Sequence, residues 1–427
     1  MDTSERERAS LTRRTFLGCS AGLAAGLAVG SGTATARSSA STTVLARNTY
    51  LGVDLTRLFQ ARSLEDVRTI AGELLASVEP THYEARADAI AGEIEATGAD
   101  VVALQEGAML RTQRPGDFGS EGAESASKVV VDFLSLIESA LAARDLEYEV
   151  VASTVTTDVE LPADTGDRAV DVRVTDRDAL LVRGDLGVGE TTTGTFDAAL
   201  SLPVPETDRR ITLQRGFCSA DVVADGVGYT AVSTHLESVS ERFRLQQAGE
   251  LLDRLPEDRP VFVCGDFNSG PGGTEATYNR LTESLTDAYA TRKPDAEGYT
   301  CCQAADLANE TSQLDRRIDA ILFRGDVRPA AAGRVGHEPD DRVEAGLDGA
   351  TSLVWPSDHA GVVGSFEVAG STPTPSPTAT ERSTPTEPAE EATEASEGSS
   401  EGGLGPGPGV LAVLAGLGGG VLARLYR

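Results

Sequence analysis

An apolar run ends in a carboxylate, a carboxamide and several glycines in the stretch Val261-Phe262-Val263-Cys264-Gly265-Asp266-Phe267-Asn268-Ser269-Gly270-Pro271-Gly272-Gly273. Such a run predicts a buried strand that opens into a loop. Side chains alternate along a strand, so Asp266 and Asn268 are expected on one side, where they suit a polar, phosphorylated reactant. The same residues are ordinary turn formers, and a strand ending in an Asx turn explains them equally well. The rest of the chain has to distinguish these interpretations.

Strand-like and helical runs alternate through residues 43–368, on both sides of this stretch. The segments 110–127 and 158–176 are predicted to be loops that carry specificity. So many strands favour an α/β body built as a two-sheet sandwich over a simple alternating parallel sheet. The predicted helices are 84–97, 128–144 and 242–255, and the predicted strands are 44–48, 100–106, 148–151, 179–182, 217–223, 229–234, 318–323 and 361–368.

The composition is strongly acidic. The 427-residue chain has a formal net charge of -30, and Lys128 and Lys293 are its only lysines. Concentrated salt screens repulsion between surface carboxylates, so this composition favours a salt-adapted protein. Disorder is the competing explanation for the charge, but regular apolar segments persist through the middle of the chain. An acidic surface disfavours nucleic-acid binding only in dilute salt, so nucleic acid stays open as a substrate.

Residues 1–36 are predicted to be a twin-arginine-type signal peptide. Arg13 and Arg14 precede a small-residue apolar run, and Ala34-Thr35-Ala36 offers a cleavage site. An N-terminal anchor helix is the alternative, but the run is short and glycine-rich for a membrane span. We therefore expect export by the twin-arginine pathway.

The C-terminal end is predicted to tether the body to the cell surface. Residues 369–404 form a stalk rich in Thr, Pro, Ser and Glu, which is typical of disordered segments. Residues 405–427 combine a Pro-Gly element, a short apolar run and a basic end. This order resembles archaeal sorting signals that are replaced by a lipid, although Pro408 stands where an aromatic residue is typical. Either the segment or a replacing lipid is expected to hold an extracellular monomer at the membrane.

Polar side chains recur just beyond the apolar runs of the body, in an order that chance does not readily produce. Together they resemble the endonuclease/exonuclease/phosphatase superfamily, which includes pancreatic-type deoxyribonucleases, abasic-site endonucleases, sphingomyelinases and inositol-phosphate phosphatases. Residues 48–55, 300–303 and 355–359 are similar to a secreted branch of it. The resemblance spans most of residues 43–368 and implies a four-layer α/β/β/α sandwich with two central mixed sheets. The residues that carry it are Asn48, Glu106, His235, Asp266, Asn268, Asp319, Asp358 and His359.

The resemblance implies a metal site and a general base. Glu106, Asn48 and Asp358 would bind the metal, and an oxygen-only ligand set suits Mg²⁺ or Mn²⁺ rather than Zn²⁺. His359 would be the base, oriented by Asp319, because a carboxylate on one ring nitrogen fixes the tautomer and raises basicity.

The remaining residues would handle the phosphate. Asp266 and Asn268 would position the attacking water and grip the phosphate, while His235 would donate a hydrogen bond to it or protonate the leaving group. Asp178 is a weak candidate for the acidic partner of His235. Arg215 either faces the phosphate as a substrate-binding residue or is a structural arginine.

Structural explanations compete with several of these roles. His235 could be a buried histidine that is bonded to the backbone. Asp319 could pair with Arg316 or Arg317, in an ion pair of modest value. Glu106 could be a neighbour of a helix N-cap.

Four cysteines remain once the signal peptide is removed: Cys218, Cys264, Cys301 and Cys302. Outside the cell they permit disulfides, with three full pairings possible. A bond between the adjacent Cys301 and Cys302 is strained and is not expected, and the spacing does not favour zinc. Asn309-Glu310-Thr311 is a glycosylation sequon.

The sequence therefore predicts a metal-dependent phosphoesterase that cleaves a phosphodiester or phosphomonoester by in-line attack of an activated water, outside the cell. An extracellular endonuclease acting on DNA or RNA, and a non-catalytic binding module on the same fold, are the alternatives. No basic, aromatic-studded groove favours DNA. A calcineurin-type metallophosphatase, suggested by Gly265-Asp266, needs a dinuclear His/Asp set, for which four histidines are too few.

Overall fold

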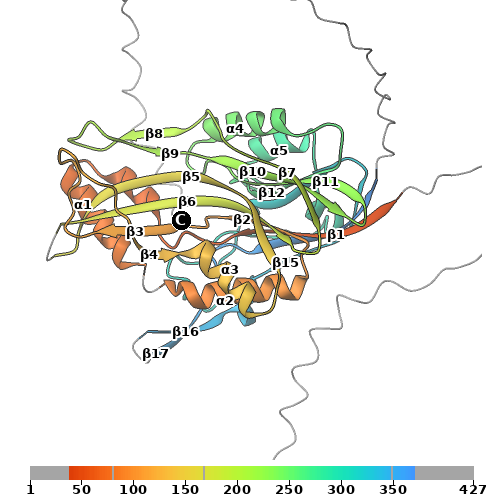
Figure 1. Ribbon diagram of the computed structural model, residues 1–427, viewed down its shortest axis with the longest axis horizontal. Helices are drawn as coiled ribbons and strands as arrows, with labels where there is room; N and C mark the ends of the chain where they lie inside the picture. The colour runs from red at the N-terminus through yellow and green to blue at the C-terminus, as the bar shows by residue number, and fades with distance from the viewer. Residues whose placement is uncertain (1–37, 79–80, 167–168, 348–349, 371–427) are drawn as a thin grey trace, which may run out of the picture. The chain divides into compact units, whose positions relative to one another are not determined.

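The computed structural model describes residues 38–78, 81–166, 169–347 and 350–370 (Figure 1). The predicted signal peptide, the predicted stalk beyond Gly370 and the predicted C-terminal anchor lie outside these residues, so they stay predictions. Within the described ranges, no helix has both the length and the apolar character that a membrane crossing requires.

One large mixed sheet forms half of the body, with the strand order β15-β18-β1-β2-β6-β3-β4 and with β5 also paired to β6. β1 and β2 run parallel, and Asn48 pairs with Gln105 at their carboxyl ends. Glu106 directly follows, so two predicted site residues reach the same sheet edge. The strands are β1 Ser39–Asn48, β2 Val101–Gln105, β3 Met109–Gln113, β4 Lys128–Asp132, β5 Tyr148–Asp164, β6 Ala169–Arg183, β15 Val327–Val335 and β18 Gly361–Ala369.

A second mixed sheet has the order β13-β14-β12-β11-β10-β7. β11 and β12 run parallel, with His235 beside Asp266, and Asp266 in turn pairs with Asp319 on antiparallel β14. Three predicted site residues therefore stand in one row. The strands are β7 Gly187–Thr195, β10 Gly216–Ala224, β11 Val227–His235, β12 Val261–Asp266, β13 Thr286–Asp287 and β14 Asp319–Arg324, and two separate pairs are β8 Leu200–Pro203 with β9 Arg210–Leu213 and β16 Val343–Leu347 with β17 Ala350–Val354.

Helices lie against the outer side of each sheet (Figure 1). The first three pack on the first sheet, where Ser63 and Asp66 form a capping box that starts α1. Next, α4 and α5 cover β11, β12 and β14 of the second sheet. The helices are α1 Leu64–Ala76, α2 Tyr83–Thr97, α3 Phe133–Ala143, α4 Glu241–Arg254, α5 Ala276–Thr282 and α6 Ala288–Arg292, with 3-10 turns η1 Leu55–Gln60 and η3 Pro339–Asp341.

The inner faces of the two sheets pack on each other through a buried aromatic cluster. The ring centroid of Phe262 lies 4.7 Å from that of Phe366 and 5.3 Å from that of Tyr229. Truncation of such a ring to alanine typically costs about 3–5 kcal/mol, so this contact holds the sheets firmly together. The predicted α/β class with two central mixed sheets is confirmed.

Three predicted segments have a different structure. Residues 110–127, predicted as a loop, begin within β3. Residues 128–144, predicted as one helix, form β4 and then α3, because the β-branched run Val129–Val131 suits a strand and Asp132 caps the helix by accepting from the Ser135 amide. Residues 158–176, predicted as a loop, belong mostly to the hairpin of β5 and β6. Most of its polar residues alternate with apolar ones along the strands, and these polar residues gave the segment the composition of a loop.

Candidate active site

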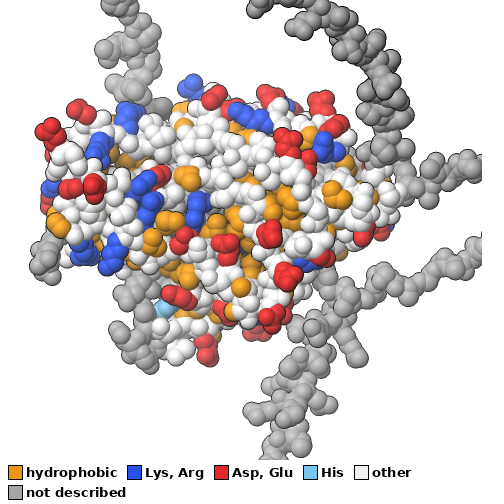
Figure 2. All heavy atoms as spheres, viewed as in Figure 1, with side chains coloured by type: hydrophobic (Ala, Val, Ile, Leu, Met, Phe, Trp, Pro, Cys, Tyr) orange, Lys and Arg blue, Asp and Glu red, His pale blue; other side chains and the backbone are white. Residues whose placement is uncertain are grey.

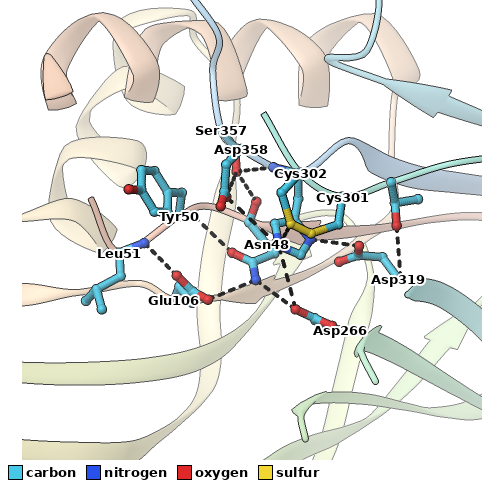
Figure 3. A network of polar contacts seen from close by, with 12 residues as sticks. Asn48, Tyr50, Leu51, Glu106, Asp266, Cys301, Cys302, Asp319, Ser357 and Asp358 are labelled. Carbon is cyan, nitrogen blue, oxygen red and sulfur yellow. Dashed lines mark hydrogen bonds and ion pairs between the residues drawn. A yellow bond between two sulfur atoms is a disulfide. The ribbon is translucent and has the colours of Figure 1, made fainter. Parts of the chain in front are cut away.

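The candidate site lies where the two sheets meet at one edge. Asn48, from the first sheet, places its Nδ2 atom 3.0 Å from Glu106 Oε1 and 3.2 Å from Asp266 Oδ2 on the second sheet. Figure 3 shows these three residues turned toward one another, with Asp358 on the neighbouring loop. The predicted strand-end residues are therefore brought together.

His359 and Asp319 form a buried pair. His359 Nδ1 lies 2.8 Å from Asp319 Oδ2, and the two residues are 6% and 2% exposed. The other ring nitrogen, Nε2, is directed to the site, 3.8 Å from Asp266 Oδ2. Burial lowers the pKa of His359, but the charges of Asp319 and Asp358 outweigh burial and hold the pKa well above its ordinary value. This geometry fits a base that a carboxylate orients.

The arginines near Asp319 have other partners. Arg317 lies 3.2 Å from Asp287, and Arg316 lies 3.2 Å from Asp315. Neither forms an ion pair with Asp319 among the described residues. Asp319 is paired with His359 instead, so the structural explanation, an ion pair with Arg316 or Arg317, does not hold.

His235 is bonded to a cation. Arg215 Nη1 lies 2.9 Å from His235 Nδ1, and because a guanidinium only donates, Nδ1 accepts and the ring proton resides on Nε2. Nε2 faces the site, 3.5 Å from Asp266 Oδ2. Burial, followed by the charges of Arg215 and His359, holds the pKa of His235 well below its ordinary value. Of its two predicted roles, this favours hydrogen-bond donation over protonation of the leaving group.

Asp178 is not the partner of His235, contrary to the weak prediction. Arg215 occupies the Nδ1 side, and both carboxylate oxygens of Asp178 have no hydrogen-bond partner among the described residues. Asp176, instead, forms an ion pair with Arg215: its Oδ2 atom lies 3.7 Å from Arg215 Nη1. Sequence reasoning missed Asp176, although its position two residues before Asp178 on β6 places both on one strand face.

Asp266 and Asn268 fit both interpretations of their stretch: they form an Asx turn, and they also face the candidate site. The Asn268 amide donates to Asp266 Oδ1 at 2.8 Å, which is an Asx turn. The same turn directs Asp266 Oδ2 toward Asn48 and brings Asn268 Nδ2 to 3.1 Å from His235 Nε2. Burial and the neighbouring Asp319 raise the pKa of Asp266 to about 6. Gly265 is required here because a Cβ atom would collide with the Thr234 carbonyl on β11.

Glu106 lies among other buried carboxylates. Its Oε2 atom accepts from the Leu51 amide at 2.7 Å. Burial, and then the charges of Asp176 and Asp358, raise the pKa of Glu106 to about 7. Repulsion between buried carboxylates is relieved by a cation, and oxygen donors are those that a hard divalent ion prefers. The residues present therefore fit a divalent metal ion.

The other two predicted metal ligands, Asp358 and Asn48, differ in which atoms they direct to the site. Asp358 Oδ1 lies 4.0 Å from His359 Nε2 and so belongs to the same cluster. Asn48 directs its amide nitrogen to the two carboxylates, while its Oδ1 accepts from the Tyr50 amide at 2.9 Å. To serve as a ligand, the Asn48 amide would have to turn over.

A buried arginine that sequence reasoning missed holds the loops of the site. Arg86 of α2 donates to the carbonyls of Thr49, of Tyr50 at 2.8 Å and of Pro356 at 3.0 Å. These carbonyls follow β1 and precede Asp358, so one guanidinium joins the two chain segments that carry the metal-binding candidates.

Cys301 and Cys302 are joined by a disulfide, so the prediction that they would not pair is wrong. The backbone of Cys301 bridges Arg316 on one side and His359 on the other. Cys218 and Cys264 are buried as free thiols.

Comparison with known proteins gives one family. A sequence profile of the Endonuclease/Exonuclease/phosphatase family matches residues 70–359. No curated protein matches the chain significantly.

Several solved structures are similar. An endonuclease/exonuclease/phosphatase family protein from Bacteroides thetaiotaomicron is 16% identical, with a TM-score of 0.47 over 78% of this chain and 99% of that one. The mannosyl-6-phosphatase Bt3783 of Bacteroides thetaiotaomicron VPI-5482 is 16% identical, with a TM-score of 0.44 over 76% and 99%. The human Nocturnin catalytic domain is 18% identical, with a TM-score of 0.42 over 78% and 96%.

The profile match has two consequences for the predictions. Members of this family hydrolyse phosphoric esters, so the predicted enzyme class is confirmed. They generally depend on a divalent metal ion, in agreement with the carboxylates gathered at the sheet edge. The resemblance seen in the sequence is confirmed as well: the chain belongs to the endonuclease/exonuclease/phosphatase family.

Proposed function

We propose that the protein is an exported phosphoesterase that cleaves a phosphodiester or phosphomonoester by in-line attack of a water activated by His359, with Mg²⁺ or Mn²⁺ as its metal. The observation that carries the proposal is the Asp319–His359 pair, 2.8 Å apart, whose free Nε2 atom faces buried carboxylates. A base held in one tautomer beside a metal-binding carboxylate cluster is the combination that phosphoester hydrolysis requires.

His359 takes a proton from the attacking water at Nε2. Asp319 keeps Nδ1 protonated and stabilises the imidazolium that forms. Asp266 Oδ2, 3.8 Å from Nε2, accepts from the same water and fixes its direction. Neutralisation of charge on the phosphoryl oxygens is the chemistry that a divalent cation bound by Glu106 and Asp358 supplies.

His235 and Asn268 bind the phosphate. His235 presents Nε2–H because Arg215 blocks Nδ1, and the neutral ring donates without giving up its proton. Asn268 lies beside it, with Nδ2 3.1 Å from Nε2; both groups are donors, so they do not bond to each other and both are available to the phosphate. Arg215 then acts through His235 and through the positive charge that it brings to the phosphate.

An endonuclease remains the second candidate within this chemistry. Basic side chains gather over β3 and β6, but acidic ones are interspersed with them (Figure 2). Arg173 and Arg177 are paired with Asp158 and Asp132, respectively. Paired arginines offer little charge to a polyanion, so a small phosphate ester suits this surface better than a long nucleic acid.

An activity screen tests the proposal. The full chain is assayed in concentrated salt with Mg²⁺ or Mn²⁺ against DNA, RNA, phospholipids and small phosphate esters. We expect the variants E106Q and H359A to lose activity at least about a hundredfold on whichever substrate is cleaved, and H337A, outside the site, to keep it. Full activity in H359A would contradict the proposed mechanism, and inactivity on every substrate would favour a binding module.

Export and surface tethering are part of the same proposal. They are supported by the paired arginines before an apolar run and by the apolar, basic C-terminal segment. The variant R13K/R14K is expected to accumulate inside the cell, whereas R62K is exported normally. Equal surface amounts of both variants, measured by immunoblots of cell fractions, would refute export by this pathway.

A further inference from the structure

Two sulfur atoms and one imidazole nitrogen lie together beside the candidate base. The Sγ atoms of Cys301 and Cys302 and a ring nitrogen of His359 all lie within 4.8 Å of one another. Cys302 Sγ is 3.9 Å from His359 Nε2, the nitrogen that is not bonded to Asp319. None of these atoms except Nε2 takes part in the proposed hydrolysis.

Backbone hydrogen bonds hold the cysteine segment in this position. The Cys301 amide donates to the Arg316 carbonyl at 2.9 Å, and the Ala360 amide donates to the Thr300 carbonyl at 2.8 Å. The Gln303 amide also donates to the Asp358 carbonyl at 2.8 Å. The backbone of the segment is therefore held from both sides, which keeps Cys301 and Cys302 next to His359.

The separation between Cys302 Sγ and His359 Nε2 suits two ligands of one tetrahedral metal ion. Zinc bonds of about 2.3 Å to sulfur and about 2.0 Å to nitrogen, at a tetrahedral angle, place the two ligand atoms about 3.5 Å apart. The observed 3.9 Å between Cys302 Sγ and His359 Nε2 is close to that value. Asp319 on the opposite ring nitrogen is the outer carboxylate that metal-bound histidines commonly have.

Arg316 favours the charged form of both sulfur atoms. Its Nη2 atom lies 3.5 Å from Cys301 Sγ and 3.4 Å from Cys302 Sγ. A nearby guanidinium stabilises a thiolate, which is the form that binds metals. The disulfide itself offers no such ligand, so the redox state of the pair decides whether the site exists.

We propose that reduction of the Cys301–Cys302 disulfide creates, with His359, a site for one thiophilic divalent cation such as Zn²⁺ or Cd²⁺, which then occupies the Nε2 atom needed for hydrolysis. A thiol or phosphine reductant supplies two electrons, the S–S bond breaks, and the sulfur atoms take up two protons. The cation displaces these protons to solvent when it binds. The proposal has two halves. The binding half, that the cation binds, stands independently; the inhibitory half, that the bound cation blocks hydrolysis, rests on the proposed function.

Cadmium titration of the full chain tests the binding half. Reduced protein is expected to show ultraviolet thiolate-to-Cd²⁺ charge-transfer absorption that saturates at one Cd²⁺ per chain, and oxidised protein is expected to show none. C302S should lose this absorption, and H359Q should bind at least about tenfold more weakly. C264A, which removes a buried thiol elsewhere, should match the unaltered chain. Absorption that persists in C302S, or that is equal in oxidised and reduced protein, would overturn the site.

Activity with added Zn²⁺ tests the inhibitory half. In excess Mg²⁺, we expect low concentrations of Zn²⁺ to inhibit the reduced protein at least about tenfold more strongly than the oxidised protein, and C302S to lose the difference. Stoichiometric binding without any redox-dependent inhibition would refute occupation of Nε2. A protein that lacks activity in both redox states would refute the proposed function instead, and the cadmium absorption would still report on the site.

Discussion

His235 and His359 share one site, but their Nδ1 atoms have partners of opposite charge. Arg215 donates to His235, whereas Asp319 accepts from His359. One ring is therefore kept neutral and the other is favoured as a cation, which divides hydrogen-bond donation and proton uptake between them.

The tautomer of His235 can be measured directly. We expect long-range ¹H–¹⁵N spectra to show a neutral ring protonated at Nε2 at the pH where a free histidine is half protonated, because burial and then the charge of Arg215 lower its pKa. In R215Q, the charge is removed while burial remains, so the pKa of His235 should rise toward its ordinary value. A cationic His235 near pH 6 in the unaltered protein would contradict the assignment.

Asp319 is expected to set the pH at which the enzyme becomes active. The base works when deprotonated, so activity rises as pH passes through the pKa of His359. The charge of Asp319 raises that pKa, so D319N should move the acidic limb of the kcat profile to lower pH. Its plateau should fall at least about tenfold, because a weaker and less oriented base remains. An unmoved limb would show that another group controls it.

At the scale of the elements, Arg86 couples the site to α2. It is fully buried, and its guanidinium lies 5.1 Å from the ring centroid of Tyr83 and 4.7 Å from that of Phe133. Its three accepting carbonyls belong to two loops that lie far from this helix in the sequence.

Replacement of Arg86 by methionine should therefore both destabilise the protein and misplace the site. Each buried carbonyl left without a donor costs about 1–3 kcal/mol, so we expect R86M to lower the free energy of unfolding by at least about 3 kcal/mol and to lower kcat. R144M is the matched control: Arg144 makes exposed ion pairs with Asp88 and Glu95 and should cost about 1 kcal/mol or less. Urea unfolding measures both, and equal losses would refute the coupling.

The strand ends were the part of the site that the sequence could predict. An apolar run that stops at a polar residue marks a sheet edge, and this pattern located Glu106, His235 and Asp266. Contacts between side chains distant in sequence leave no local pattern, so the bond from Arg215 to His235 was missed. The length of β6 was missed because one face of a strand can be polar throughout.

At the scale of the whole molecule, the excess of carboxylates predicts a dependence on salt. The formal net charge is -30, and screening over about 3 Å at 1 M salt, against about 10 Å at 0.1 M, weakens its self-repulsion. We expect the urea unfolding midpoint to rise as NaCl increases through this range, and an equal osmolality of sucrose to give a smaller rise. A midpoint that does not rise with NaCl would refute the salt-adapted interpretation.

The pairing of β1 with β18 also determines when the chain can fold during its synthesis. Ser39 pairs with Ala369, and β18 lies between β1 and β15 in the sheet. Of the strands that the structure describes, the first to leave the ribosome therefore pairs with the last. A message that stops just after His359 would encode every residue of the candidate site, yet its product would lack the strand that joins β1 to β15. We therefore expect no active enzyme until translation has passed residue 369.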